Sequence, residues 1–470
     1  MSETIELNKY KRKVSSLERI FNRSPYAIVT MVARIKGNVS ENLLKDAVAK
    51  VQQRHLNLKV RLYEDTDHNL WFTSEGVKEI PIEIVSRESD EDWIEMYHEA
   101  SKIPFDFEER PAIRFILVQS PEISELIILC HHIICDGLSL AYLARDIMTH
   151  LGDPTRKVEV LSKPTPMDKD NFPQDISINP VVKFIINNRI NKKWKKDEIY
   201  FDQEDYKSLT EAYWNKYKHQ MLSIELSEEQ TSALVDRCRK EGVTVNTALT
   251  AAFVGAQTII QEGKVNPRIA IGASLRDRLL RPAGEAMGFF AGGPSLNYKY
   301  KIKKNFWENA RKLHRKVKPL YTNKNVFKEL IPWAYLEPGI MESLCYKILG
   351  ELVPKDSPRY TKLSAFSQQN DVVSSLIKQE KMESLDKPFL GTAVTNLTRL
   401  DFPRKYGTLE LDRLIMNPGG MFPLAQVELV LGAVTCAGKL SLLVEYVEET
   451  IDSRTMEKIK EKALEFLLSE

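Results

Sequence analysis

Features that commit a chain to a membrane or to secretion are scarce in this sequence of 470 residues. No stretch approaches the roughly 18–20 consecutive apolar residues that a membrane-spanning helix needs. The first residues, MSETIELNKYKRKVSS, are polar and lack the apolar core of a signal peptide. We therefore expect a cytoplasmic protein without a transmembrane segment, for which peripheral contact is the one kind of membrane association left open.

Cysteine is also scarce, and neither sign of charge dominates. The five cysteines are odd in number and form no CxxC pair, which favours reduced, buried thiols over a disulfide framework or a zinc site. The 67 basic and 65 acidic residues give a net charge of only +2. This balance does not indicate a nucleic-acid partner, since such proteins carry strongly basic surfaces.

Several common catalytic and cofactor motifs are missing. The phosphate-binding glycine loops GxGxxG and GxxxxGK[ST] are both absent, so we expect no tightly bound nucleotide cofactor. The serine elbow GxSxG is absent as well, because the segment GASLR at 272–276 lacks the second glycine. Its absence argues against a covalent acyl-enzyme and in favour of direct transfer in any acyl chemistry.

The remaining pattern predicts an α/β protein with two similar lobes. Strand and helix signals alternate through 1–155, dissolve into prolines, asparagines and lysines through a connection at 156–215, and return in 216–470. Ser227 and Gln230 form a capping box that opens a helix. The strands expected in the first lobe are 27–35, 56–63, 70–73, 81–85, 112–119 and 125–132. The strands expected in the second lobe are 219–226, 268–274, 295–302, 391–397, 426–436 and 440–446.

The segment around His131 and His132 contains residues that can act in proton transfer. Residues 126–132 read LIILCHH, and both faces of such a strand are apolar, which is typical of a central, buried strand. Since successive side chains point to opposite faces, His131 and His132 cannot do the same job. A histidine with a pKa near 6.5 is a suitable general base at neutral pH. Asp136, four residues later, needs a cationic or hydrogen-bonding partner.

Two other interpretations of these residues stay open. A histidine at a strand end is more often packed or hydrogen-bonded in the core than catalytic. The pattern HHxxxD is also a partial metal site, but no third ligand cluster is visible among the eight histidines, so no metal is expected. The residues alone do not decide between a catalytic and a structural histidine.

Three segments carry a resemblance to a known superfamily. HHIICDG (131–137) matches the HHxxxDG signature shared by chloramphenicol acetyltransferase, the condensation domains of nonribosomal peptide synthetases and bacterial alcohol acyltransferases. SLRDRLLRPAGEAMGFFAGG (274–293) resembles the block NLRxR…G…GNF of that superfamily. VTNLTRLDFPRKYG (394–407) resembles the closing segment of stand-alone acyltransferases associated with polyketide lipids.

The resemblance implies a fold and a base. It predicts two chloramphenicol acetyltransferase-like lobes, each a mixed sheet flanked by helices, with a tunnel between them. Acyl donor and acceptor then enter from opposite ends. His132 is implied to be the catalytic base in the middle of the tunnel, and His131 is implied to be structural.

The resemblance also implies the residues that surround the base. Asp136 is expected to point away from the histidine and to form a structural ion pair with Arg276. Gly137 fits the tight turn into the following helix. Thr395 and Asn396 are the candidates for an oxyanion or tunnel role, because they lie in the matching closing segment.

The function implied is an acyltransferase of secondary metabolism or lipid biosynthesis. It moves an acyl group from a thioester donor, either acyl-coenzyme A or an acyl carrier protein, to an alcohol or amine acceptor, and it is expected to act as a monomer. A free-standing peptide condensation enzyme that forms an amide is the alternative within the same chemistry. A catalytically idle homologue that binds a carrier protein or a lipid is the alternative from another class.

Two basic stretches with interleaved aromatic residues, 183–196 and 298–318, remain without an assignment. They suit docking of an acidic carrier protein, of coenzyme A phosphates or of an anionic membrane. Ordinary solvated surface is the simpler interpretation of both.

Overall fold

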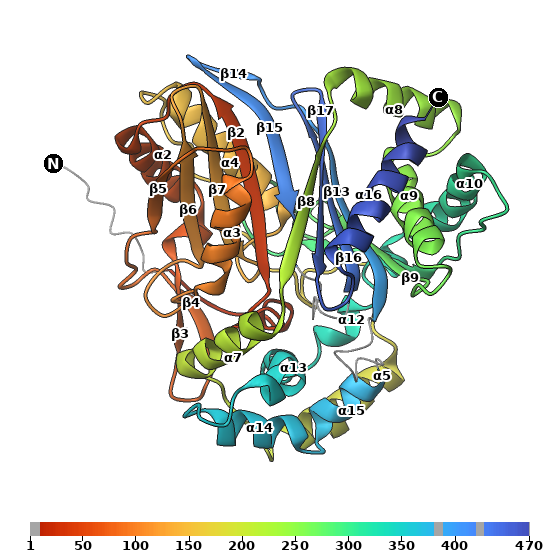
Figure 1. Cartoon of the computed structure of the whole chain (residues 1–470). Coiled ribbons are helices and arrows are strands. Elements are labelled where there is room, and N and C mark those ends of the chain that lie inside the picture. Colours follow the sequence, from red (N-terminus) through yellow and green to blue (C-terminus); the bar gives the residue numbers. More distant parts are fainter. Residues whose placement is uncertain (1–9, 380–388, 420–426, 470) are drawn as a thin grey trace.

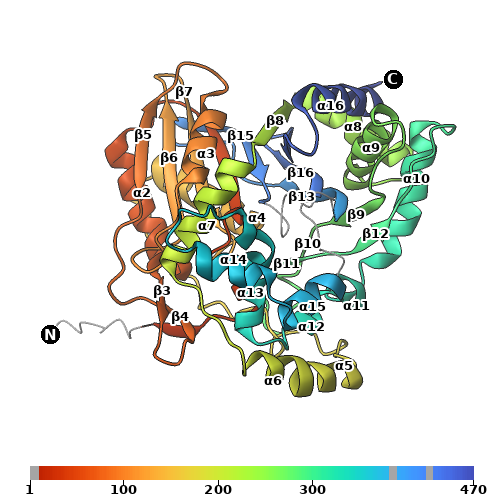
Figure 2. The ribbon, with the colours of Figure 1, turned by 60° about the horizontal axis from the view of Figure 1, so that its bottom comes forward.

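The computed structural model describes residues 10–379, 389–419 and 427–469 (Figure 1). Two six-stranded mixed sheets stand side by side, and helices flank both of them. A largely helical region lies across one end of the pair, as Figure 2 shows from another side. The predicted α/β class, with two mixed sheets flanked by helices, is confirmed.

The first sheet is built mainly from the N-terminal third of the chain. Its strand order is β14-β15-β2-β7-β6-β5, with all neighbours antiparallel except β5 and β6. Helices α2 and α4 cover one face and α3 covers the other (Figure 1). The bounds are β2 (Ile28–Lys36), α2 (Glu41–Arg54), β5 (Ile82–Ser86), α3 (Asp92–Lys102), β6 (Ile113–Gln119), β7 (Ile123–His131), α4 (Gly137–Gly152), β14 (Lys405–Tyr406) and β15 (Leu409–Asn417).

The second sheet belongs to the C-terminal half. Its strand order is β12-β9-β13-β16-β17-β8, and β13 runs parallel to both β9 and β16. The almost fully buried helix α9 packs against α10, α16 and β13. The bounds are β8 (His219–Glu225), α8 (Glu228–Lys240), α9 (Val245–Ile260), β9 (Arg268–Ile271), β12 (Ser295–Asn297), α10 (Phe306–Val317), β13 (Leu390–Leu400), β16 (Val427–Cys436), β17 (Lys439–Val447) and α16 (Ser453–Leu468).

Smaller elements complete the molecule around a second apolar core. A three-stranded sheet has the order β1-β4-β3, and β10 pairs with β11. Helices α1, α12, α13, α14 and α15 pack together with α7 below the two large sheets (Figure 1). The bounds are β1 (Lys11–Lys13), α1 (Ser16–Arg19), β3 (Arg61–Glu64), β4 (Leu70–Thr73), α7 (Gln203–Lys216), β10 (Ala273–Ser274), β11 (Ala291–Gly292), α11 (Asn323–Val326), α12 (Leu330–Trp333), α13 (Pro338–Leu349), α14 (Tyr360–Gln368) and α15 (Val372–Gln379).

Helix starts follow the local sequence signals. The Ser40 side chain accepts a hydrogen bond from the backbone N–H of Leu43 and so caps α2. Ser227 and Gln230 form the predicted capping box at the start of α8, with bonds in both directions. These helices therefore begin where unpaired N–H groups find a side-chain acceptor.

A strand exchange ties the two halves of the chain together. β15, far along the sequence, pairs antiparallel with β2 in the first sheet and also contacts β16 and β17 of the second. A Cβ on Gly432 in β16 would lie 2.0 Å from the carbonyl oxygen of Met416 in β15. The two sheets approach this closely because Gly432 has no side chain. The lobe boundaries expected at 1–155 and 216–470 did not anticipate this exchange.

Other expectations differ in detail. Residues 56–63 begin with a 3-10 turn, Leu56–Lys59, before β3, and 295–302 contains only the short strand β12. Strand β15 and the helices between 323 and 379 were not predicted. Within the described residues, no single helix is long and apolar enough to cross a membrane, and α8 with α9 meets that test only as a pair bent by 96°.

We expect Gly432→Ala to lower the free energy of unfolding by about 2 kcal/mol, because the added methyl group meets a backbone carbonyl that cannot rotate away. Urea unfolding of the purified protein measures the change. Gly242→Ala is the control: no atom lies within 4 Å of its added Cβ, although its φ of +65° carries a backbone cost. A Gly432 variant no less stable than the Gly242 variant would contradict the close approach of the sheets.

Candidate active site

His132 lies immediately after the central strand β7. The strand ends at His131, and the backbone N–H of His132 still donates to the carbonyl oxygen of Ala27 at 2.8 Å. Residues 132–136 then turn the chain into α4. The ladder of β2 and β7 therefore fixes the backbone from which the His132 side chain projects.

One hydrogen bond sets the protonation pattern of the His132 ring. Nδ1 lies 2.8 Å from the carbonyl oxygen of Cys135. A carbonyl oxygen only accepts, so Nδ1 carries the hydrogen and Nε2 of the neutral ring is the unprotonated nitrogen. This tautomer presents Nε2 as a proton acceptor.

Aromatic side chains enclose the same ring. Phe21 stacks on it at 4.3 Å between ring centroids, and Phe289 meets it edge-on at 5.2 Å. Burial lowers the pKa of His132 below 6.5, although the Cys135 carbonyl and the charge of Asp136 oppose the shift. The ring is therefore neutral at physiological pH, which is the form that can accept a proton.

His131 points into the core instead. Its Nε2 donates to the carbonyl oxygen of Ser24 at 3.1 Å, and its ring meets Phe107 edge-on at 4.8 Å. Burial lowers the pKa of His131 to about 3, so the ring stays neutral. The two histidines thus have the different surroundings that their adjacency in a strand predicted.

Asp136 and Arg276 form a buried ion pair. Arg276 Nη2 lies 2.7 Å from Asp136 Oδ1, and the residues are 2% and 4% exposed respectively. Arg276 Nη1 also donates to the carbonyl oxygens of Gly284 and Ala286 at 3.0 and 2.7 Å. Asp136 Oδ2 accepts from the backbone N–H of Phe290 at 3.1 Å. The pair expected from the sequence is present and joins the histidine turn to the 276–290 segment.

Ser139 belongs to the hydrogen-bond network of Asp136 and Arg276, and the sequence did not predict it. Its backbone N–H and hydroxyl both contact Asp136 Oδ1, at 2.8 and 2.9 Å, so Asp136 caps α4. Its hydroxyl also lies 2.6 Å from Arg276 Nη2 and 3.1 Å from the carbonyl oxygen of Gly288. The spacing Asp136-x-x-Ser139 resembles a helix capping signal and could have indicated it.

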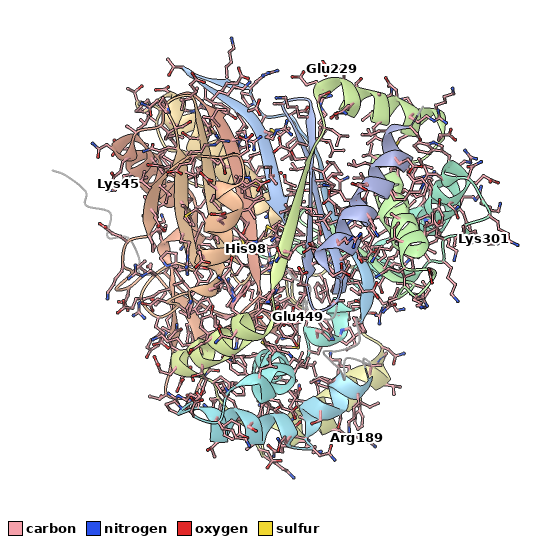
Figure 3. The ribbon with its side chains drawn as sticks, viewed as in Figure 1. Lys45, His98, Arg189, Glu229, Lys301 and Glu449 are labelled. Carbon is pink, nitrogen blue, oxygen red and sulfur yellow. The ribbon has the colours of Figure 1, made fainter. Side chains whose placement is uncertain are left out.

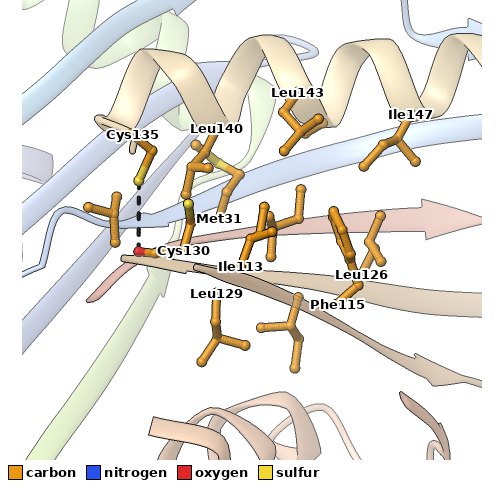
Figure 4. Packing of buried hydrophobic residues seen from close by; sticks show 14 of the residues in the cluster. Met31, Ile113, Phe115, Leu126, Leu129, Cys130, Cys135, Leu140, Leu143 and Ile147 are labelled. Atoms are coloured by element: carbon orange, nitrogen blue, oxygen red, sulfur yellow. Dashed lines mark hydrogen bonds between the residues drawn. The ribbon is translucent and has the colours of Figure 1, made fainter. Parts of the chain in front are cut away.

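Packing beneath the turn holds α4 against the sheet (Figure 4). The Cys135 thiol lies 3.7 Å from the carbonyl oxygen of Cys130 in β7. Leu140, Leu143 and Ile147 of α4 lie over the strands in the same apolar cluster. Burial raises the pKa of the Cys135 thiol well above its usual range, so it is not a nucleophile.

A cavity of 1070 Å³ opens beside the first turn of α4. Asp136, Gly137, Thr395 and Asn396 are among its lining residues, so the structure brings both predicted oxyanion candidates to this turn. A Cβ on Gly137 would lie 3.0 Å from Leu397 Cδ2, so the start of α4 packs closely against the closing segment.

His132 is not among the residues that line this cavity. A tunnel that passes the His132 ring is therefore not observed in the described part of the chain. The described residues also contain no cluster of three or more potential metal-ligating side chains.

We expect Arg276→Met to lower the free energy of unfolding by about 3–5 kcal/mol, because it leaves the buried Asp136 carboxylate without its cation. Urea unfolding measures the loss. Arg399→Met is the matched control, since Arg399 pairs with Asp401 on the exposed surface and is expected to matter little. Equal midpoints for the two variants would contradict the structural role of the buried pair.

Comparisons with known proteins concern the family pattern and the fold. Residues 1–162 match the family model of the Condensation domain. A linear gramicidin synthase of Brevibacillus parabrevis is 22% identical over an alignment of 379 positions, which covers 74% of this chain and 7% of that protein. A dimodular nonribosomal peptide synthase of Bacillus subtilis is 28% identical over 148 residues, 31% of this chain and 6% of that protein. The chain spans less than a tenth of the length of these curated relatives.

Solved structures share the fold over the whole chain. The polyketide synthase associated protein 5 of Mycobacterium tuberculosis has a TM-score of 0.58 at 14% identity, covering 97% of this chain and 98% of that one. The trichothecene 15-O-acetyltransferase of Fusarium sporotrichioides has a TM-score of 0.61 at 12% identity, covering 98% and 95%. The chain therefore has the fold of the condensation-domain and chloramphenicol acetyltransferase-like proteins, and its first 162 residues carry the condensation-domain sequence pattern.

Proposed function

We propose that this protein is an acyltransferase that moves an acyl group from a thioester to an alcohol or amine, with His132 as the general base. The observation that carries the proposal is the contact of His132 Nδ1 with the Cys135 carbonyl oxygen, which leaves Nε2 as a proton acceptor. A neutral imidazole held in one tautomer is what direct acyl transfer needs from its base.

The proposed reaction needs no covalent enzyme intermediate. Nε2 of His132 takes the proton of the acceptor hydroxyl or amine while that atom attacks the thioester carbonyl carbon. The tetrahedral intermediate collapses by breaking the carbon–sulfur bond. The imidazolium then returns the proton to the departing thiolate, so the products are an ester or amide and a free thiol. The Cys135 carbonyl oxygen stabilises the imidazolium between these steps.

Asp136 acts in this proposal as a positioning residue. Both of its carboxylate oxygens are engaged by Arg276, Ser139 and the backbone N–H of Phe290. The partner of His132 Nδ1 is a backbone carbonyl, so the arrangement differs from a Ser-His-Asp triad, where a carboxylate fills that place. Asp136 and Arg276 hold the turn that contains Cys135.

Thr395 and Asn396 are retained as the proposed oxyanion or tunnel residues. Both line the cavity beside Asp136 and Gly137. Asn396 Oδ1 accepts from the backbone N–H of Thr398 at 2.7 Å, so the Nδ2 group of the same side chain is the donor available to a substrate oxygen. A donor of this kind stabilises developing charge on a carbonyl oxygen.

The donor and acceptor are proposed only as classes. The curated relatives are peptide synthetases, which favours a carrier-bound thioester and an amide product; the fold neighbours include an O-acetyltransferase, which favours an ester. Acyl-coenzyme A or an acyl carrier protein therefore remains the proposed donor. The enzyme is proposed to be cytoplasmic and monomeric and to hold no tightly bound cofactor. Amide condensation is the second candidate, and the mass of the product distinguishes the two.

We expect His132→Ala to lower acceptor-dependent thiol release by about 10²–10⁴-fold, the usual contribution of a positioned general base. Purified protein is incubated with acyl-coenzyme A and acyl-carrier thioesters plus mixed alcohols and amines. Free thiol and product mass are followed together.

His68→Ala is the matched control, because His68 is an exposed histidine that contacts Glu64 and Tyr200. It should keep the parent rate. Equal turnover by the His132 variant and the parent protein would overturn the proposed base. Absence of turnover across a broad panel would favour the alternative of a homologue that only binds a carrier protein or lipid.

The lowered pKa of His132 predicts the pH profile. Only the neutral ring accepts a proton, so kcat/KM should be constant at neutral pH and fall as the pH drops through the pKa of His132. Because burial lowers that pKa from 6.5, the acidic limb should have its midpoint below pH 6.5. A rate profile with a midpoint above pH 7 would contradict His132 as the base.

A further inference from the structure

One helix on the surface of the described chain is strongly basic and also exposes apolar side chains. Helix α5 (Pro180–Ile185), a π-helical turn (Ile186–Ile190) and α6 (Asn191–Trp194) follow one another without a break. They project from the periphery of the molecule in Figure 2. We call residues 180–196 the basic helix. Nothing in the proposed acyl-transfer chemistry uses it.

One side of the basic helix is firmly anchored. The side chains of Ile186 and Trp194 are buried. Asn191 makes two hydrogen bonds to the segment before α13: its side-chain amide donates to the Tyr335 carbonyl oxygen, and its side-chain oxygen accepts from the Glu337 backbone N–H. The helix is therefore a fixed platform, and its other side keeps a defined orientation.

Large apolar side chains stand exposed at the beginning of this platform. Val181 is 66% exposed and Phe184 is 59% exposed, and Val182 and Ile185 are 39% and 38% exposed. Four such side chains within five residues form a continuous apolar tip. Contiguous exposed apolar surface of this kind marks an interaction site, since burying it is favourable.

The rest of the exposed side is strongly cationic. Residues 180–196 contain six basic and no acidic residues. Lys195 pairs with Glu337, and Lys183 lies over the Tyr335 ring. Four exposed cations have no ion-pair partner among the described residues: Arg189 (seen at the edge of Figure 3), Lys192, Lys193 and Lys196.

We propose that the basic helix docks the protein on an anionic lipid surface, with the apolar tip inserted among the acyl chains. A bilayer interface supplies both requirements at once, anionic headgroups for the lysines and an apolar layer beneath them. Lysine side chains reach headgroups from a helix that lies in the interface. An acidic carrier protein would satisfy the charges but not the four exposed apolar side chains.

The test uses the full-length protein and flotation with phosphatidylcholine vesicles, prepared with and without phosphatidylglycerol. We expect binding to the anionic vesicles, weakened by salt, and little binding to phosphatidylcholine alone. Replacing the tip by Val182→Ser, Phe184→Ser and Ile185→Ser should weaken vesicle binding by about tenfold or more. Replacing the cations by Lys192→Gln, Lys193→Gln and Lys196→Gln should do the same at low salt.

The matched control lies on the other basic stretch of the chain. Ile302 is 60% exposed between Lys301 and Lys303, so Lys301→Gln, Ile302→Ser and Lys303→Gln make a comparable change elsewhere on the surface (Lys301 is labelled in Figure 3). This control should bind vesicles as the parent protein does. All substituted side chains are exposed, so thermal unfolding should be unchanged in every variant.

Three outcomes would overturn the proposal. The parent protein could fail to float with anionic vesicles, or the control could lose as much binding as the helix variants. The third is unchanged flotation of the lysine variant together with a loss of its turnover that is restricted to carrier-bound thioesters. That result would assign the basic helix to an acidic protein partner instead.

Discussion

The buried ion pair between Asp136 and Arg276 is the constraint on which the site depends. It joins the first turn of α4 to the 276–290 segment of the C-terminal half, and each partner makes further bonds: Asp136 caps the helix, and Arg276 holds two backbone carbonyls. A buried pair of this kind has a large desolvation penalty, so its value lies in the arrangement it enforces rather than in net stability. Here that arrangement is a fixed turn between β7 and α4.

That turn determines what His132 can do. Because the Cys135 carbonyl takes the hydrogen on Nδ1, the ring is held in one tautomer without any carboxylate beside it. The aromatic side chains of Phe21 and Phe289 then keep the ring neutral and limit its movement. Burial and a backbone carbonyl thus dominate the electrostatics at the His132 ring, while the ion pair of Asp136 and Arg276 holds the turn and the charge of Asp136 opposes the burial shift. This division of roles distinguishes the site from a charge-paired catalytic triad.

Local signals in the sequence predicted much of this, and long-range pairing was the part they missed. The Ser227–Gln230 capping box and the apolar run of β7 depend on neighbours a few residues away, so they could be predicted from the sequence. Strand β15 could not, since buried Asp412 and Arg413 interrupt its apolar pattern. Besides each other, they pair with Lys439 and Glu225, which lie in other strands. His132, Asp136 and Arg276 came from a motif resemblance. Phe21, which stacks on His132 from more than a hundred residues away, carried no signal at all.

The strand exchange has a consequence for how the protein is made. Lys36 and Glu410, which are paired between β2 and β15, are separated by 374 positions. During synthesis the N-terminal sheet must wait, with the edge of β2 uncovered, until the ribosome has reached β15. Contacts of such high sequence separation fold slowly, and an uncovered apolar strand edge invites aggregation in the meantime. The edge of β2 is therefore open to wrong pairing throughout that interval, however stable the folded protein is.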